Sequence, residues 1–192
     1  MRIISGEFGG RTIRSVEGPG YRPATAKVRG AIFSMLEARG IDWEETHVLD
    51  LFAGSGSLTF EALSRGAVRG VLMEKNRKAA ACISENGKSL GLRGSRVRVV
   101  AKDLFKVLNT VPDKPFSLVF IDPPYGKDLL EPALVKAIAN GWIAEDAFVL
   151  AEVESGLELD ADAVSPFLET LTDKLYGQTR IIVWKKRKSA KS

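Results

Sequence analysis

The sequence is poor in the residues that build disulfide frameworks and metal centres. It has one cysteine and one histidine in 192 residues. The lone Cys82 excludes an internal disulfide framework and fits a reducing cytoplasm. His47 precedes a predicted strand, and a structural role is favoured over a catalytic one. The single cysteine thus favours a cytoplasmic protein, and we also expect a monomer without a metal site.

Long apolar runs are also missing. No run reaches the roughly 18 apolar residues of a membrane-spanning helix. The first residues, Met-Arg-Ile-Ile-Ser-Gly, lack the apolar core of a secretion signal. We therefore expect no membrane partner.

Two common nucleotide-binding signatures are incomplete. The turn Ala53-Gly54-Ser55-Gly56 joins a predicted strand to a predicted helix, but Thr59 occupies the place of the third glycine of the dinucleotide fingerprint. No lysine follows to make a phosphate-binding P-loop. A nicotinamide dehydrogenase is thus disfavoured, although the turn still lets a ligand approach the backbone near a helix N-terminus.

Positive charge is abundant near the start of the chain, whereas the net charge of +4 is modest. Arg2-Ile-Ile and Arg11-Thr-Ile-Arg are separated by glycines, which predicts a hairpin arm with little to bury. Such an arm either caps the edge of a sheet or contacts nucleic acid. A second basic run, Lys185-Lys-Arg-Lys, lies near the end of the chain.

A helix follows the arm. Thr25 can cap it, its apolar stripe includes Ile32 and Phe33, and Gly40 ends it. We take residues 1–40 as a basic arm with its helix, and residues 41–192 as one compact catalytic domain.

Strands and helices alternate through that domain, which predicts an α/β fold with a largely parallel sheet. The predicted strands are 47–52, 70–74, 97–101, 116–122 and 147–153. The predicted helices are 57–65, 76–90, 104–109, 131–140 and a short one at 161–169. Residues 170–176 and 179–184 flank Gly177-Gln178 and predict an antiparallel closing hairpin.

Acidic residues end two of these strands. Glu74 lies about twenty residues past the glycine turn, where an acid commonly binds ribose hydroxyls; the alternative is an ordinary surface strand end. Asp103 follows the third strand. It could receive an adenine amino group, or equally cap the short helix after it.

The strongest chemical motif is Ile121-Asp122-Pro123-Pro124-Tyr125. Two prolines end a buried strand, since proline cannot donate to a ladder. An ionised Asp122 and the Pro123 carbonyl accept hydrogen bonds, and Tyr125 offers a stacking face. At the carboxyl edge of an α/β sheet these residues suit a planar, amino-bearing ring.

Taken in order, these motifs resemble class I S-adenosylmethionine-dependent methyltransferases, and Asp-Pro-Pro-Tyr is similar to the subgroup that methylates exocyclic amines of nucleobases. The flanking residues are similar to the bacterial 16S rRNA guanine-N2 methyltransferases of the RsmD type. These flanks are Arg2-Ile-Ile-Ser-Gly, Gly10-Arg11, Arg22-Pro23-x-Thr25-x-x-Val28-Arg29, Leu49-Asp-Leu-Phe-Ala-Gly-Ser-Gly56, Glu61-Ala-Leu-Ser-Arg-Gly66 and Tyr176-Gly177-x-Thr179. Ala24, Ala26-Lys27 and Gly30 depart from the usual family pattern.

The resemblance implies a Rossmann-like fold with a seven-stranded, mostly parallel sheet, an antiparallel closing strand and an N-terminal hairpin arm. It implies S-adenosylmethionine as cofactor, and 16S rRNA in the small ribosomal subunit or its assembly intermediate as partner. The implied cofactor-binding residues are Asp50, Phe52, Gly54, Gly56, Glu74, Asp103 and Leu104. The implied catalytic residues are Asp122, Pro123, Pro124 and Tyr125. The implied RNA-binding residues are Arg2, Arg11, Arg22, Lys27 and Arg29.

Two other functions stay open at this stage. A DNA adenine-N6 methyltransferase usually carries a further recognition domain, for which this chain has little room. A non-catalytic RNA-binding or assembly module is disfavoured by the intact Gly54, Gly56, Glu74 and Asp122. A protein-glutamine methyltransferase is disfavoured, because such enzymes prefer Asn where this chain has Asp122.

Overall fold

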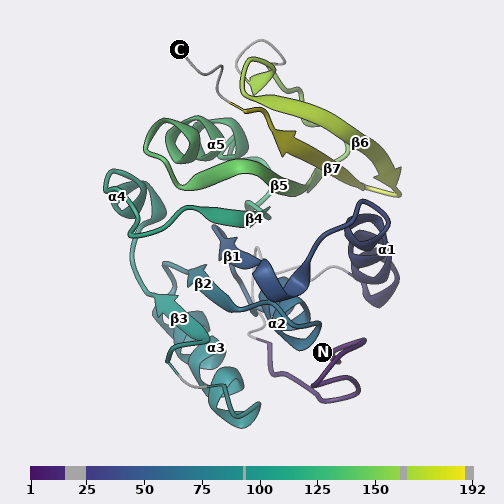
Figure 1. Cartoon of the computed structure of the whole chain (residues 1–192), viewed down its shortest axis with the longest axis vertical. Coiled ribbons are helices and arrows are strands. Elements are labelled where there is room, and N and C mark those ends of the chain that lie inside the picture. The colour runs from purple at the N-terminus through teal and green to yellow at the C-terminus, as the bar shows by residue number, and fades with distance from the viewer. Residues whose placement is uncertain (16–24, 93, 161–163, 189–192) are drawn as a thin grey trace.

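A computed structural model describes residues 1–15, 25–92, 94–160 and 164–188, and within them one seven-stranded sheet forms the centre of the molecule (Figure 1). The strand order is β3-β2-β1-β4-β5-β7-β6, and in this described sheet β7 runs in the opposite direction to the other six strands. The strands are β1 (His47–Asp50), β2 (Arg69–Met73), β3 (Val97–Val100), β4 (Phe116–Ile121), β5 (Ile143–Glu154), β6 (Leu168–Tyr176) and β7 (Thr179–Lys186). Strand order reverses between β1 and β4, where ligands bind in open α/β sheets.

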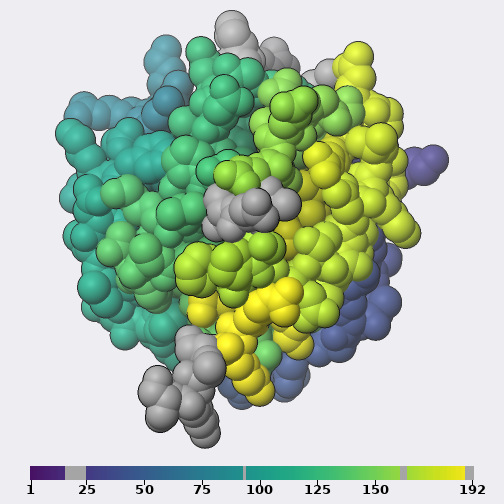
Figure 2. All heavy atoms as spheres, turned by 90° about the horizontal axis from the view of Figure 1, so that it is seen from above, coloured from purple at the N-terminus to yellow at the C-terminus, as the bar shows by residue number. Residues whose placement is uncertain are grey.

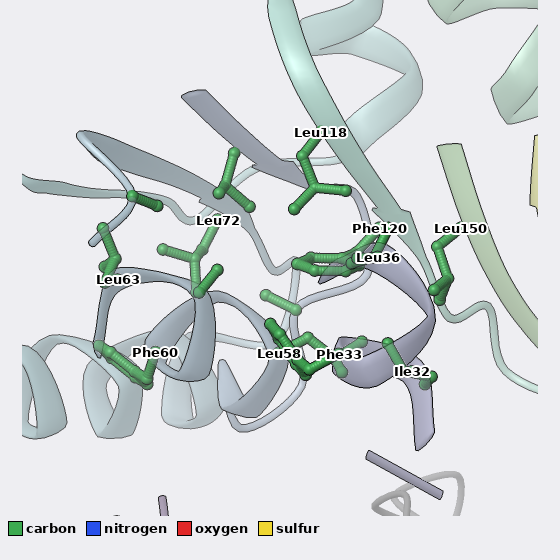
Figure 3. Close-up of a cluster of buried hydrophobic side chains, with 14 of the residues drawn as sticks. Ile32, Phe33, Leu36, Leu58, Phe60, Leu63, Leu72, Leu118, Phe120 and Leu150 are labelled. Carbon is green, nitrogen blue, oxygen red and sulfur yellow. The ribbon is translucent and has the colours of Figure 1, made fainter. Parts of the chain in front are cut away.

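Helices cover both faces of this sheet (Figure 1). They are α1 (Ala26–Glu37), the short 3-10 helix η1 (Trp43–Glu45), α2 (Ser57–Ser64), α3 (Arg77–Ser89), α4 (Leu104–Leu108) and α5 (Leu130–Ala139). Phe33 of α1 packs against Phe120 of β4, and Leu63 of α2 lies near Leu72 of β2, in the core on one face (Figure 3). Leu104 of α4 and Leu134 of α5 belong to the core on the other face.

Local sequence explains where several helices begin. Thr25 Oγ1 accepts a hydrogen bond from the Val28 N–H at 3.3 Å, as the sequence predicts for a cap. The Asn76 side chain caps α3 in the same way. Asp103 caps α4 by accepting from the Lys106 N–H at 3.1 Å, which confirms one of its two predicted roles.

The closing hairpin of β6 and β7 is confirmed. Arg39, just after α1, donates hydrogen bonds to the Leu171 carbonyl and the Thr172 hydroxyl of β6. Figure 2 accordingly shows residues of the closing hairpin next to those of α1 on the face seen from above. The predicted helix 161–169 is wrong at its end, because Leu168 already begins β6; residues 161–163 lie outside the described residues.

The N-terminal arm differs most from the prediction. It is joined by a single antiparallel bridge between Arg2 and Thr12 rather than by two regular strands. The expectation that it has little to bury is wrong, since Ile3, Phe8 and Ile13 are at most 4% exposed and belong to the core. The arm is therefore part of the folded body.

The attachment of the N-terminal arm to the rest of the protein depends on α2. The carboxylate of Glu61 accepts hydrogen bonds from the N–H groups of Ile4, at 2.7 Å, and Ser5, at 3.1 Å. The Glu7 N–H donates to the Ser64 carbonyl at 2.7 Å. None of the helices in the described ranges is long and apolar enough to cross a membrane.

Candidate active site

Three carboxylates meet at the carboxyl ends of β1, β4 and β5. Ile121 pairs with Ala151, so Asp122 and Glu152 are the next residues of two adjacent parallel strands. Ile121 and Ala151 face the core that contains α5. Because side chains alternate along a strand, Asp122 and Glu152 project to the opposite face, where α1 and α2 pack. Asp50 ends β1 on that same face.

The glycine turn lies at the same edge. Gly54 and Gly56 have φ angles of 56° and 76°, a left-handed conformation that side chains other than glycine rarely adopt. The Gly54 N–H donates to Glu74 Oε2 at 3.1 Å, and the Asn76 N–H donates to Oε1 at 2.7 Å. Backbone groups thus fix the Glu74 carboxylate between the turn and the start of α3.

This geometry fits the nucleoside part of the cofactor that the sequence resemblance implies. Each oxygen of a carboxylate has two lone pairs, so Glu74 can accept further hydrogen bonds from two ribose hydroxyls. Asp103 is exposed at the end of the next strand, and Leu104 beside it is 8% exposed. Phe52 is half-buried next to the turn. Contacts of these residues to a cofactor remain predictions.

Asp50 is almost fully buried beneath the turn, at 2% exposure. It accepts a hydrogen bond from the Thr59 hydroxyl at 2.9 Å. Burial raises the pKa of Asp50 to about 7, although the hydrogen bond from Thr59 lowers it; the charge of Glu74 adds to the rise. A positive charge beside Asp50 would therefore stabilise its ionised form.

Asp122 is half-buried at the tip of β4, next to Glu152 of β5. Burial raises its pKa well above the ordinary value, and the neighbouring charges of Glu152 and Asp50 raise it further. Asp122 therefore holds its proton to a higher pH than an exposed carboxyl group does.

The residues after Asp122 form an anchored tip. Pro123 is buried and Pro124 is half-buried, whereas the Tyr125 ring is 40% exposed. The Tyr125 hydroxyl lies 3.3 Å from Thr179 Oγ1 of β7. The Gly126 N–H donates to Glu154 Oε1 at 2.9 Å. Tyr125 thus presents an exposed ring from a backbone held by two neighbouring strands.

The sequence analysis missed Glu152, which is 4% exposed on β5. Burial raises its pKa to about 7, against the opposing charge of Arg29. The signal was present in the sequence, because a single acid interrupts the apolar run 147–153 at the level of Asp122.

Arg29 differs from its predicted place on an RNA-facing surface. It is 2% exposed, and its Nη2 donates to the Arg2 carbonyl. Burial lowers the pKa of Arg29, whereas the charges of Glu61 and Glu152 raise it. Its spacing from Ile32 and Phe33 places all three on the buried face of α1, which the sequence could have indicated.

The other predicted RNA contacts divide into two groups. Arg2, Arg11 and Lys27 are exposed, whereas Arg22 lies outside the described residues. The Arg11 guanidinium donates to the Ser89 carbonyl and lies 5.9 Å from the centre of the Phe8 ring. Their contacts to RNA stay predictions. Within the described ranges, no group of three His, Cys, Asp or Glu side chains is arranged to hold a metal ion.

Known proteins match this chain over nearly its whole length. A family model described as "Conserved hypothetical protein 95" matches residues 1–185. The ribosomal RNA small subunit methyltransferase D of Escherichia coli (strain K12) is 37% identical over 159 residues, covering 82% of this chain and 77% of that protein. The Bacillus subtilis protein YlbH is 34% identical over 189 residues, covering 97% of this chain and 100% of YlbH.

Solved structures agree with the sequence matches. The structure of yhhF from Escherichia coli superposes with a TM-score of 0.83 at 31% identity, covering 98% of this chain and 99% of that chain. This likeness confirms the predicted α/β methyltransferase fold. From the extent of the family match and from relatives above 30% identity, it follows that this chain belongs to the RsmD-type methyltransferase family.

Proposed function

We propose that this protein transfers a methyl group from S-adenosylmethionine to the exocyclic N2 amine of a guanine in 16S rRNA of the small ribosomal subunit. One observation carries the proposal: the glycine turn with Glu74 and the Asp122–Tyr125 tip lie at the same edge of the sheet. A cofactor and a flat amino-bearing ring held there would meet between β1 and β4, at the switch point of the strand order.

On the cofactor side, Glu74 would hold the ribose hydroxyls and Asp103 the adenine. Asp50, Gly54 and Gly56 would border the methionine part. When bound, the cofactor supplies an electrophilic methyl group on a positively charged sulfur. A positive charge beside Asp50 and Asp122 favours their ionised forms and lowers their raised pKa values.

On the target side, the protein mainly aligns the amine. Hydrogen bonds from the N2 amine to Asp122 and the Pro123 carbonyl would direct its lone pair toward the methyl group. Holding two reactants in a near-attack geometry can lower a barrier by about 7–11 kcal/mol. Tyr125 would stack on the base after it leaves its helix, since pairing otherwise hides the amine.

The amine loses a proton once the methyl group is attached. Asp122 is the nearest candidate to accept it, and its raised pKa makes its ionised form a better proton acceptor than an exposed carboxylate. An ionised Asp122 is needed first, which the positive charge of the cofactor favours.

Asp122→Ala tests this proposal. We expect methyl transfer to fall by at least about 10³-fold, because alignment and proton acceptance are both lost. Cofactor affinity, measured by calorimetry, should stay within about threefold. Methyl transfer is measured with tritiated cofactor on small subunits from cells that lack this protein, and the modified nucleotide is mapped in their 16S rRNA.

Glu145→Gln is the matched control, because Glu145 is exposed on β5 away from the carboxyl edge. Full turnover by Asp122→Ala would contradict the assignment of Asp122. Transfer by the wild type to duplex DNA but not to small subunits would favour an adenine-N6 methyltransferase. Absence of cofactor binding by the wild type would favour the non-catalytic RNA-binding module.

We further propose that the enzyme works as a cytoplasmic monomer on the small subunit or its assembly intermediate. The exposed Arg2 and Lys27 support an electrostatic contact with the rRNA backbone, which carries one negative charge per nucleotide.

A further inference from the structure

Two buried polar atoms, one on Glu152 next to Asp122 and one on Arg29 facing Glu152, lack hydrogen-bond partners within the described residues. They are Oε2 of Glu152 and Nη1 of Arg29. Both residues are at least nine-tenths buried, at 4% and 2% exposure. Native proteins rarely leave such atoms unpaired, because an unmade buried hydrogen bond is destabilising. Unpaired atoms next to a predicted active site are therefore candidates for contacts with substrate.

The two atoms do not bond to each other, although the side chains carry opposite charges. Arg29 reaches the site from α1, where its other terminal nitrogen donates to the Arg2 carbonyl. Glu152 reaches it from β5, on the same face as Asp122 of the neighbouring strand β4. The site thus offers one unpaired donor, one unpaired acceptor and the Asp122 carboxylate.

This set complements the Watson–Crick edge of guanine. That edge presents the O6 acceptor, the N1–H donor and the N2 amine, in this order. A guanidinium donor suits O6, and a carboxylate oxygen suits N1–H, while Asp122 takes the amine. Adenine presents the opposite pattern, an amine at position 6 and an acceptor at N1. A carboxylate and a guanidinium placed in this way would repel it.

We propose that Glu152 and Arg29 select guanine, with Glu152 accepting the hydrogen bond from N1–H and Arg29 donating to O6. The inference rests on the proposed function, because it concerns the base whose N2 amine is methylated. Both atoms lie below the surface of the free protein, so in this proposal the base would enter beside the strand tips next to Asp122 to reach them. The charge of Arg29, which faces Glu152 from α1, favours the ionised form of Glu152 against the larger effect of burial.

The test compares two bases at the modified position of 16S rRNA, in reconstituted small subunits. One is guanine and the other is 2-aminopurine, which keeps the N2 amine but lacks both the N1 hydrogen and O6. We expect the wild type to prefer guanine by at least about 10- to 100-fold in kcat/KM, which is what hydrogen bonds to charged groups commonly contribute.

Glu152→Gln should lower kcat/KM for guanine by about 10- to 100-fold while changing that for 2-aminopurine less than threefold. The preference for guanine then collapses, which a residue with a merely structural role would not cause. Glu152→Asp keeps the carboxylate on a shorter side chain and should retain part of the preference. Arg29→Lys keeps the charge but loses the planar fork, and should weaken the preference in the same direction.

Glu145→Gln again serves as the control on the same strand and should leave the preference unchanged. Cofactor affinity and the unfolding temperature of each variant are measured, so that loss of folding is recognised. If the wild type methylates guanine but Glu152→Gln keeps the same ratio between the two bases, the inference is overturned. If the wild type methylates neither base, the proposed function itself has failed.

Discussion

The two halves of the carboxyl edge differ in how completely their polar groups are paired. On the β1–β2 side, Glu74 accepts from two backbone N–H groups and Asp50 accepts from Thr59. On the β4–β5 side, Glu152 Oε2 and Arg29 Nη1 lack partners among the described residues. The half proposed to bind the cofactor is therefore organised in the free protein, whereas the half proposed to bind the base leaves buried polar atoms unpaired among the described residues.

The largest expected effect concerns the pH dependence of stability. The folded-state pKa of Glu152 is raised from 4.5 to about 7, so the folded protein binds more protons than the unfolded chain between these values. Stability should then fall as the pH rises from about 4.5 to 7. In Glu152→Gln, the decrease in unfolding free energy over this pH range should be smaller by roughly 3 kcal/mol at most.

Chemical unfolding of both proteins at pH 5 and pH 8 measures this difference. The charged groups that face Glu152 are Asp122 from β4 and Arg29 from α1, and the residue paired with it on β7 is the apolar Ile181. Glu145→Gln should show the wild-type pH dependence. If the unfolding free energy changed equally between pH 5 and pH 8 in the wild type and in Glu152→Gln, the pKa of Glu152 would not be raised in the folded protein.

A change on the cofactor side should act on cofactor binding. Glu74→Ala removes the acceptor for the Gly54 and Asn76 N–H groups and the predicted partner of the ribose. We expect cofactor affinity to fall by about 10- to 100-fold, since hydrogen bonds to a charged group are lost. Calorimetry with S-adenosylmethionine measures it.

Glu85→Gln is the matched control, because Glu85 lies exposed on α3 and only pairs with Arg14 at 3.6 Å. An affinity unchanged by Glu74→Ala would remove Glu74 from the cofactor site. The β1–β2 side of the edge could then no longer be described as a preorganised cofactor site.

The smallest effects are expected outside the edge, at the exposed cations of the N-terminal region. Arg2→Ala and Lys27→Ala should each weaken binding to rRNA only a few-fold and reduce the slope of log affinity against log salt by about 1. Lys136→Ala is the control, because α5 packs on the opposite face of the sheet from α1. If the slope of log affinity against log salt stayed unchanged, the N-terminal arm would have only a structural, capping role.

Sequence predicted the features that depend on neighbouring residues. Thr25 and Asn76 cap helices through local hydrogen bonds, and Pro123 ends β4 directly after Asp122, so their places could be predicted from short segments. The two predicted roles of Asp103 could not be separated in this way, and the structure confirms the cap.

The sequence could indicate that Arg29 and Glu152 are buried, but it could not indicate that they meet. Arg29 is buried because its face of α1 meets the sheet, and Glu152 faces it from a strand more than a hundred residues later. The arm buries Ile3 and Phe8 only because α2 supplies acceptors that hold it in place. Single-residue patterns contain no information about which surfaces meet.

The contact between Glu61 and the arm has a consequence for how the surface of this protein can change. Glu61 holds the arm through the N–H groups of Ile4 and Ser5, which every amino acid except proline provides. Outward-pointing side chains of the arm can therefore be exchanged without loosening it. Over evolutionary time such an arm can change its outer surface while its attachment to α2 stays the same.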